Sequence, residues 1–283
     1  MPNLNKRLNA WRDDLADSAL KGLVNVDLFV DGKFKLVTNA TLSLRRKAGY
    51  DSPQDSQLLL GDKVKVFEIK KNWAWVQNCR DNYVGYCPAD GLSDIGQEAT
   101  HQVSCLRTIV FPEPDIKSCP IDFLTMTSRL TIVNTNEKFS QIETGGWVYT
   151  KHLAPLNDVE SDFLATAHQF INIPYLWGGN SSLGIDCSGL VQISLRRAGI
   201  EVLRDSEMQE TSIGNFIPFE GDKSILKPGD LIFWKGHVGF FCTNDMLLHA
   251  NATDMMVSYS PFDEVCARIL KIENNPITSV RRL

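Results

Sequence analysis

The chain has 283 residues and is 43% hydrophobic, which is enough for two or three globular domains. Its net charge is -5 and it has no long basic run, so neither nucleic acid nor a membrane is an expected partner. No apolar stretch reaches the roughly 20 residues that span a bilayer, and Arg12, Asp13 and Asp14 interrupt any signal-peptide core. Seven cysteines without a Cys-x-x-Cys pair predict a reduced, cytoplasmic protein.

The first 35 residues are predicted to form an N-terminal helix and hairpin segment. Three leucines and a tryptophan at helical spacing predict a short helix over residues 4–15. The residues around Asp31-Gly32 alternate in polarity, and this dipeptide is typical of a two-residue hairpin turn.

Residues 36–155 contain an internal repeat. Short alternating stretches separated by turn residues occur in 36–95 and return more faintly in 96–155. In the second copy Leu130, Ile132 and Phe139 correspond to Val64, Val66 and Trp73 of the first. A repeat of this length, made of short strands, predicts two small β-barrels in tandem.

The composition changes after Pro155, and residues 156–283 are predicted to form an α+β domain. A helix is expected over residues 161–171, stopped by Pro174, and a second helix is expected to begin near Cys187. Strands are expected over residues 230–234, 238–242, 246–250 and 267–272. Helices followed by an antiparallel sheet are typical of this fold class.

Cys187 lies at the expected first turn of the second helix, at the open end of its apolar stripe. The unpaired backbone N–H groups and the positive end of the helix dipole favour a thiolate there. A thiolate attacks carbonyl groups, so Cys187 is a candidate nucleophile.

Two histidines follow Cys187 in the strand-rich part of the domain. His237 begins one expected strand and His249 ends the next, with Thr243-Asn244-Asp245 as the turn. The even spacing of twelve places both imidazoles on one face of the hairpin, as near neighbours. One can accept the thiol proton while the other orients it, as in acyl-transfer enzymes.

Each of these residues also has a structural interpretation. A cysteine at a helix start is more often a small buried residue, and a strand histidine is more often structural than a base. The joint occurrence of Cys187, His237 and His249 in helix–strand–strand order favours the catalytic interpretation. Neither a His-Glu-x-x-His motif, a cysteine-rich ligand cluster nor a phosphate loop occurs, so no metal or other cofactor is expected.

Several blocks of the C-terminal part resemble the signature of the NlpC/P60 cysteine peptidases. They are residues 174–179 (PYLWGG), 186–191 (DCSGLV), 227–234 (KPGDLIFW), 237–239 (HVG) and 249–250 (HA). The two repeats resemble bacterial SH3 (SH3b) domains. The resemblance implies a multidomain chain in which two small SH3-like β-barrels precede an α+β papain-like domain. The implied boundaries are 1–35 for the N-terminal segment, 36–95 and 96–155 for the barrels, and 156–283 for the peptidase domain.

The resemblance also implies roles for individual residues. Cys187 matches the nucleophile, His237 the base and His249 the third catalytic position. Tyr175 matches a tyrosine that lines the oxyanion region.

Asp186 and Ser188 match residues that bind the free amine of the substrate's N-terminal L-alanine. Both residue types are also favoured at helix N-caps, and the two roles are compatible.

In similar enzymes the first SH3b domain walls the substrate pocket with an acidic residue and a tyrosine. Asp55 and Tyr83 are the nearest matches here. An aspartate stands where the longer glutamate is common, which shortens its reach to an amine. Ordinary solvated charge and barrel packing are the alternative interpretation of this pair.

The whole layout is similar to that of γ-D-glutamyl-L-diamino acid endopeptidases of the dipeptidyl-peptidase VI type. This resemblance implies hydrolysis of the γ-D-glutamyl–diamino acid bond of short, free murein peptides during cell-wall recycling. Two alternatives remain open: an amidase or acyltransferase on the same fold, and a non-catalytic wall-binding protein.

Overall fold

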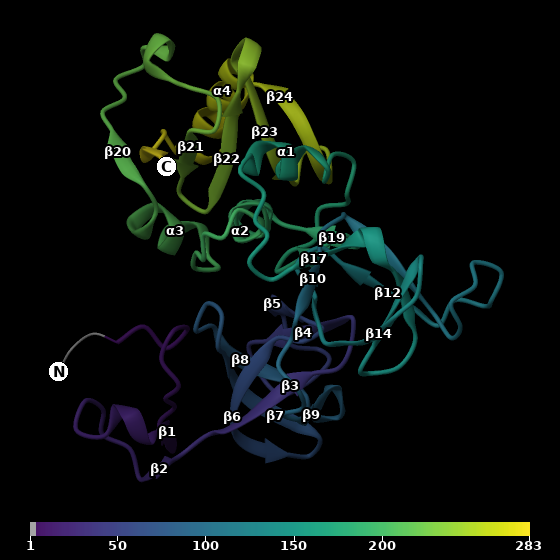
Figure 1. The fold of residues 1–283 in the computed structure, drawn as a ribbon. Helices are drawn as coiled ribbons and strands as arrows, with labels where there is room; N and C mark the ends of the chain where they lie inside the picture. The colour runs from purple at the N-terminus through teal and green to yellow at the C-terminus, as the bar shows by residue number, and fades with distance from the viewer. Residues whose placement is uncertain (1–3) are drawn as a thin grey trace. The chain divides into compact units, whose positions relative to one another are not determined.

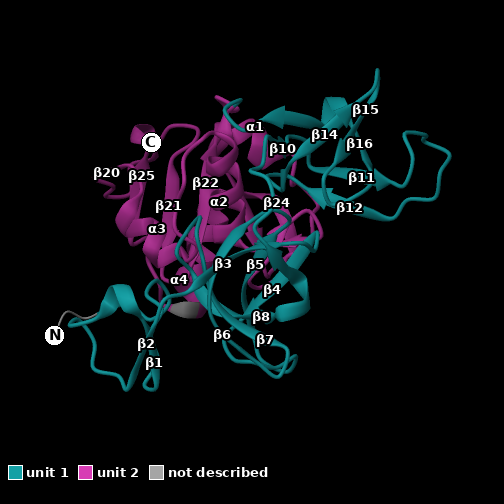
Figure 2. Ribbon diagram, turned by 60° about the horizontal axis from the view of Figure 1, so that its bottom comes forward, with its two compact units in different colours: residues 1–158 teal, residues 159–283 magenta. Residues whose placement is uncertain are grey.

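The computed structural model describes residues 4–283, without the side chain of Glu273. The chain divides into two compact units, residues 1–158 and 159–283 (Figure 2). The described part of the first unit consists of strands and short 3-10 helices, whereas the α-helices lie in the second unit together with an antiparallel sheet. The predicted order, a β-rich region followed by an α+β domain, is confirmed.

The first repeat folds into a seven-stranded sheet with the order β5-β4-β8-β7-β6-β3-β9 (Figure 1). Its strands are β3 (Lys33–Val37), β4 (Thr41–Arg45), β5 (Gln54–Leu59), β6 (Lys63–Lys70), β7 (Trp73–Asn78), β8 (Val84–Pro88) and β9 (Leu92–Asp94). Closing a barrel requires the first and last strands to pair. Here β5 and β9 stand at opposite ends of the strand order, so the predicted closed barrel is corrected to an open, SH3b-like sheet.

The second repeat forms two smaller sheets, with the orders β13-β10-β17 and β12-β11-β16-β15-β14. Its strands are β10 (His101–Val103), β11 (Arg107–Phe111), β12 (Asp122–Thr125), β13 (Arg129–Leu130), β14 (Ile132–Thr135), β15 (Phe139–Ile142), β16 (Trp147–Tyr149) and β17 (Leu153–Pro155). The described strand pairs do not close these sheets into a barrel either. Both copies end in a strand, a 3-10 helix and a strand: β8, η2 (Ala89–Gly91) and β9, then β16, η3 (Thr150–His152) and β17. This shared ending agrees with the repeat, which stays a prediction for the second copy.

The two repeats share packing. Leu60 of the first repeat is buried in the hydrophobic cluster of the second, among Val103, Leu130 and Ile142. The adjacent Gly61 has φ +78°, and a Cβ there would lie 2.2 Å from the backbone oxygen of Arg129. This contact requires glycine, because a side chain would both strain the backbone and collide with its neighbour.

The predictions for the N-terminal segment are wrong in detail. The described residues 4–14 contain no helix, and the elements that follow are β1 (Leu15–Asp17), η1 (Ser18–Leu20) and β2 (Leu28–Val30). An isolated helix this short is marginal, and Ala10 and Leu15 instead pack against Phe67 and Trp75 of the first repeat.

The predicted hairpin around Asp31-Gly32 does not form either. β2 pairs in parallel with β1, whereas β3 pairs with β6 and β9. The chain passes so close to β6 at Gly32 that a Cβ would lie 2.6 Å from Lys65 Cγ. Packing against β6 therefore replaces the local turn.

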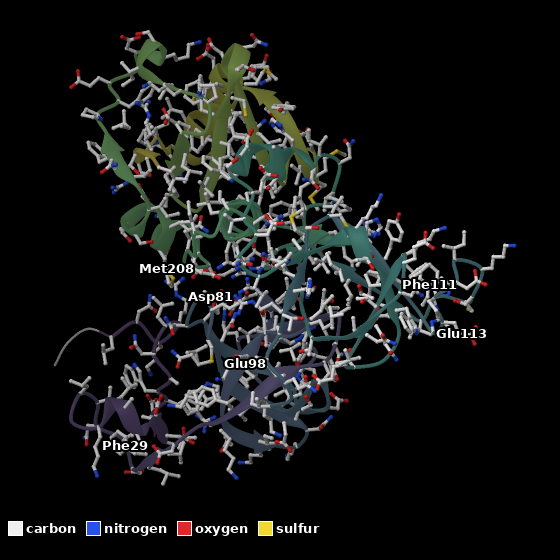
Figure 3. The ribbon with its side chains drawn as sticks, in the orientation of Figure 1. Phe29, Asp81, Glu98, Phe111, Glu113 and Met208 are labelled. Carbon is white, nitrogen blue, oxygen red and sulfur yellow. The ribbon has the colours of Figure 1, made fainter. Side chains whose placement is uncertain are left out.

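The second unit contains a six-stranded sheet with the order β20-β25-β21-β22-β23-β24, in which the paired strands are antiparallel; Figure 2 labels β20, β25, β21 and β22. The strands are β20 (Asn215–Ile217), β21 (Leu231–Trp234), β22 (His237–Cys242), β23 (Met246–Asn251), β24 (Met256–Pro261) and β25 (Ser279–Arg282). The helices are α1 (Phe163–His168), α2 (Cys187–Arg197), α3 (Ser206–Ser212), with the buried Met208 labelled in Figure 3, and α4 (Phe262–Glu273). The α2 helix packs against β22 and β23, and α4 packs against β23 and β24.

The strand predicted over residues 267–272 is wrong, because α4 occupies this segment. Phe262, Val265 and Ile269 recur with helical spacing and pack onto Trp234 and Leu247 of the sheet. The alternation of residues 267–272 is therefore a weaker indication of structure than the helical spacing of Phe262, Val265 and Ile269. None of the described helices is long and apolar enough to cross a membrane.

Candidate active site

The start of α2 positions Cys187. Asp186 is the N-cap residue, and its Oδ1 accepts a hydrogen bond of 2.7 Å from the backbone N–H of Gly189. A Cβ at Gly189 would lie 2.4 Å from the backbone oxygen of Gly179, so glycine allows the preceding loop to cross the helix closely. Cys187 is the first helical residue and is 7% exposed.

Tyr175 is held beside this helix start by backbone pairing. It forms an isolated bridge with Ile185, and the backbone N–H of Leu176 donates to the oxygen of Ile185 at 3.1 Å. Burial raises the pKa of Tyr175, and the nearby negative charges that Cys187 and Asp186 can carry raise it further. Its phenol therefore keeps its proton and can donate a hydrogen bond near the Cys187 sulfur.

The predicted histidine hairpin is confirmed. β22 and β23 are joined by the short η5 (Thr243–Asp245) and pair in antiparallel register. His237 Nε2 and His249 Nδ1 are 2.8 Å apart, within hydrogen-bonding distance. Gly239 leaves room for this pair, because a Cβ there would lie 3.0 Å from the Cβ of His249.

The thiol of Cys187, on α2, lies against the first residues of β22. Its sulfur is within hydrogen-bonding reach of the backbone N–H of Val238, the residue that follows His237. The structure therefore brings the nucleophile candidate and the two histidines into one cluster within the second unit.

Burial sets the resting protonation of this cluster. It raises the pKa of the Cys187 thiol to about 12, reinforced by the Asp186 carboxylate. It lowers the pKa of His237 to about 4 and that of His249 to about 3, with Arg268 adding to the effect on both. Burial therefore acts against the thiolate that the helix N-terminus favours, and it favours a neutral thiol beside neutral imidazoles.

This protonation predicts a stability that falls on mild acidification. A histidine whose folded pKa lies below its unfolded value of about 6.5 stabilises the fold above that value. The contribution is lost as the pH falls from about 6.5 towards the folded values of about 4 and 3. Urea midpoints of the second unit, read by pulse-labelling hydrogen exchange, should fall between pH 7 and pH 5.

A His249→Asn variant is the control for this prediction. It removes one of the two buried imidazoles, so its midpoint should fall less over the same pH interval. Equal losses in the two proteins would contradict the assignment of the acid sensitivity to the histidine pair.

Asp186 is the centre of a buried hydrogen-bond network that no sequence pattern predicts. Arg204 donates from Nη1 to Asp186 Oδ1 at 2.9 Å and from Nη2 to Oδ2 at 2.7 Å. Gly178 N–H donates to Oδ2 at 2.8 Å, and the Ser188 hydroxyl lies 3.3 Å from Oδ1. With the helix cap, these bonds hold the carboxylate in place at the start of α2.

The same network engages Ser188. Its Oγ accepts a hydrogen bond of 2.8 Å from Arg204 Nη1. Both residues are buried, Arg204 being 1% exposed and Ser188 6%. Amine binding by Asp186 and Ser188 stays a prediction, and the structure adds a positional role for both. Arg204 carried no sequence signal, because it is a single arginine in the connection between α2 and α3.

Asp55 and Tyr83 lie in the first unit. Asp55 is paired with Arg46 through contacts of 2.7 and 3.1 Å. Tyr83 is 3% exposed, and its backbone N–H donates to Asp81, labelled in Figure 3, at 3.1 Å. Their predicted contact with a substrate stays a prediction. Among the described residues, no group of three or more His, Cys, Asp or Glu side chains is placed to hold a metal ion.

A buried cysteine at a helix start, next to two hydrogen-bonded histidines on a sheet, is the arrangement of a cysteine peptidase. Comparison with known proteins agrees with this class. Residues 172–269 match the NlpC/P60 family, and residues 44–92 match the bacterial dipeptidyl-peptidase Sh3 domain. The chain belongs to the NlpC/P60 family and carries an N-terminal bacterial SH3 domain.

Individual relatives extend over most of the chain. Dipeptidyl-peptidase 6 of Lysinibacillus sphaericus is 30% identical over 232 residues, which cover 74% of this chain and 84% of the relative. The gamma-D-glutamyl-L-lysine dipeptidyl-peptidase of Bacillus subtilis is 26% identical over 226 residues, covering 72% and 74%. The crystal structure of an NlpC/P60 family protein from Bacillus cereus has the same fold, with a TM-score of 0.73 at 20% identity, covering 88% of this chain and 99% of that one.

Proposed function

We propose that this peptidase hydrolyses the γ-D-glutamyl–diamino acid bond of free murein peptides with an unblocked N-terminal L-alanine. The observation that carries the proposal is the His237–His249 hydrogen bond beside the Cys187 sulfur. The substrate class is supported by the relatives named gamma-D-glutamyl-L-lysine dipeptidyl-peptidase. The proposed setting is the recycling of wall peptides in the cytoplasm.

The first half of the reaction forms an acyl-enzyme. His237 takes the thiol proton of Cys187 as the sulfur attacks the carbonyl carbon at the γ-carboxyl of D-glutamate. The tetrahedral intermediate collapses by breaking the C–N bond. His237 returns its proton to the departing amine of the diamino acid, so the proton that left the thiol leaves with the product.

The second half releases the dipeptide. His237 takes a proton from water, whose oxygen attacks the thioester carbon. The C–S bond then breaks, L-Ala-D-Glu leaves with a free γ-carboxyl group, and the proton returns to the sulfur. His249 keeps His237 oriented throughout, through their 2.8 Å hydrogen bond.

The negative oxygen of each tetrahedral intermediate needs donors. Backbone N–H groups at the start of α2 and the protonated phenol of Tyr175 lie in this part of the site. Such donors act most strongly in a site that excludes water, where they are oriented before the charge develops.

Tyr175→Phe tests the oxyanion role. Removing one such donor is expected to lower kcat on the order of 10²-fold, with a small change in KM. The ring stays in place, so the packing around Cys187 is preserved. Steady-state kinetics on the tripeptide measure the effect, and an unchanged kcat would show that Tyr175 does not stabilise the oxyanion.

Recognition of a free amine would restrict the enzyme to peptides already released from the glycan. An L-alanine still attached to the wall has an acylated nitrogen that carries no charge. Asp186 and Ser188 of the second unit are proposed to bind the ammonium group. The aspartate would supply the negative charge and the serine hydroxyl would supply a hydrogen bond.

The test compares L-Ala-γ-D-Glu-diaminopimelate and its lysine analogue with the same peptides acetylated at the N-terminus. Mass spectrometry with fresh, reduced enzyme should detect L-Ala-D-Glu from the free peptides and at least tenfold slower release from the acetylated ones. Intact free tripeptides would refute the proposed function. Equal cleavage of free and acetylated peptides would refute amine recognition alone.

A further inference from the structure

The hydrogen-bonded chain at the site does not end at His249. The other ring nitrogen of this residue, Nε2, lies 3.1 Å from the hydroxyl oxygen of Ser260 on β24. His249 is 0% exposed and Ser260 is 8% exposed, so solvent does not readily replace this partner. Ser260 is paired in register with Leu247, two residues before His249, and therefore reaches the imidazole diagonally across the strands.

The reaction sets the direction of these hydrogen bonds. His237 Nε2 is engaged with His249, so the proton from Cys187 must be taken by Nδ1. A neutral imidazole with a free Nδ1 carries its proton on Nε2. His237 must therefore donate to His249 Nδ1, and a neutral His249 must then carry its own proton on Nε2, facing Ser260.

We propose that Ser260 is a positioning residue that accepts this proton in a hydrogen bond and holds His249 as its Nε2–H tautomer. The proposal rests on the proposed catalytic roles of Cys187 and His237. Without the hydroxyl, the buried Nε2–H would have no acceptor, and the opposite tautomer would place a proton on His249 Nδ1 against the Nε2–H of His237. His237 could then be oriented only in a form that does not accept the thiol proton.

The effect is larger when His237 is charged. The hydrogen bond from imidazolium to His249 Nδ1 draws charge onto the second ring and strengthens its Nε2–H as a donor. The other charges that act on His249 are Arg268 of α4 and Asp254 after β23. Ser260 is therefore expected to act on the chemical step more than on substrate binding.

A neighbouring serine provides a matched control. Ser258 lies on the same strand and is paired in register with His249. Its hydroxyl donates to Asp254 Oδ2 at 2.7 Å and accepts from Asn251 Nδ2 at 2.9 Å. Ser258→Ala removes the same atom from the same strand without touching the imidazole chain.

The direct test is the tautomer of His249 in the full chain. The protein contains five histidines, and long-range ¹H–¹⁵N spectra of histidine-labelled protein distinguish Nδ1–H from Nε2–H forms. A His249→Asn variant assigns the signals. The wild type and Ser258→Ala should show the Nε2–H form, and Ser260→Ala should shift the His249 signals or mix the forms. An Nδ1–H form in the wild type would overturn the proposal.

Kinetics provide the second readout. Ser260→Ala should lower kcat about tenfold, with KM nearly unchanged. A loss of this size is typical when the hydrogen-bond partner of the outer ring nitrogen of a metal-binding histidine is removed. Ser260→Thr, which keeps the hydroxyl on a strand-favouring side chain, should restore at least half of the rate. An unchanged kcat in Ser260→Ala would also overturn the proposal.

The alkylation rate of Cys187 by iodoacetamide separates this inference from the substrate assignment, because it needs no peptide. Peptide mass spectrometry reads Cys187 apart from the other cysteines. The rate at pH 7 should fall severalfold in Ser260→Ala and recover in Ser260→Thr. If the tripeptide is not cleaved by the wild type, this rate and the tautomer still decide the role of Ser260. If Ser260→Ala does not fold, the wild-type tautomer and Ser260→Thr decide it.

Discussion

Replacing Cys187 with alanine is expected to abolish cleavage of the tripeptide. Without a sulfur no acyl-enzyme forms, and the two histidines have no proton to take. Loss of a nucleophile that works with a base as one unit costs on the order of 10⁶-fold in kcat. Mass spectrometry of L-Ala-D-Glu release over a day should therefore detect no turnover above the enzyme-free control.

Cys242→Ala is the matched control for this change. Cys242 is a buried cysteine at the end of β22, and its sulfur contacts the backbone oxygen of Phe240 at 3.6 Å. The substitution Cys242→Ala removes a buried thiol from the strand that carries His237 but leaves the cluster of Cys187, His237 and His249 intact. This variant should keep kcat within about twofold of the wild type. Cleavage that survives in Cys187→Ala would show that another group is the nucleophile.

Replacing Arg204 with methionine is expected to lower the free energy of unfolding of the second unit by about 3–5 kcal/mol. The substitution keeps a flexible, unbranched side chain, although a shorter one, and leaves the buried Asp186 carboxylate without its cation. It also removes the donors to Ser188 Oγ and to the backbone oxygen of Gly179, which lies 3.1 Å from Arg204 Nη2. Urea unfolding with pulse-labelling hydrogen exchange at α2 measures the change.

Two further variants test the physical reason for this loss. The double variant Asp186→Asn, Arg204→Met leaves no buried charge and retains a residue that caps helices, so it should be more stable than Arg204→Met alone. Lys223→Ala breaks exposed pairs with Asp245 and Asp263 in the same unit and should leave its stability nearly unchanged. A double variant less stable than Arg204→Met would contradict the buried-charge explanation.

The parts of the fold that were predicted correctly depend on local pattern. The helix beginning at Cys187 and the hairpin carrying His237 and His249 follow from periodicity and turn residues within short windows. The repeat in the first unit was predicted from corresponding apolar residues, and both copies end in a strand, a 3-10 helix and a strand.

The errors occur where packing against distant residues overrides local preference. Residues 4–15 have helical spacing, but Ala10 and Leu15 pack against Phe67 and Trp75 of the first repeat without forming a helix. The sheets of the first unit are open, although closed barrels were predicted. Closure depends on pairing between strands far apart in sequence, and no local sequence pattern indicates such pairing.

In the active site, too, some features follow from local sequence pattern and others depend on packing between distant residues. The nucleophile candidate and its two histidines could be predicted from the sequence, because a helix start and a two-strand hairpin place them through backbone geometry alone. Their protonation could not be predicted, because burial depends on everything packed around them. The partners of the site, Arg204 for Asp186 and Ser260 for His249, likewise became visible only in the folded structure. Buried polar groups must be paired, but their partners can come from any element that the fold brings within about 3 Å.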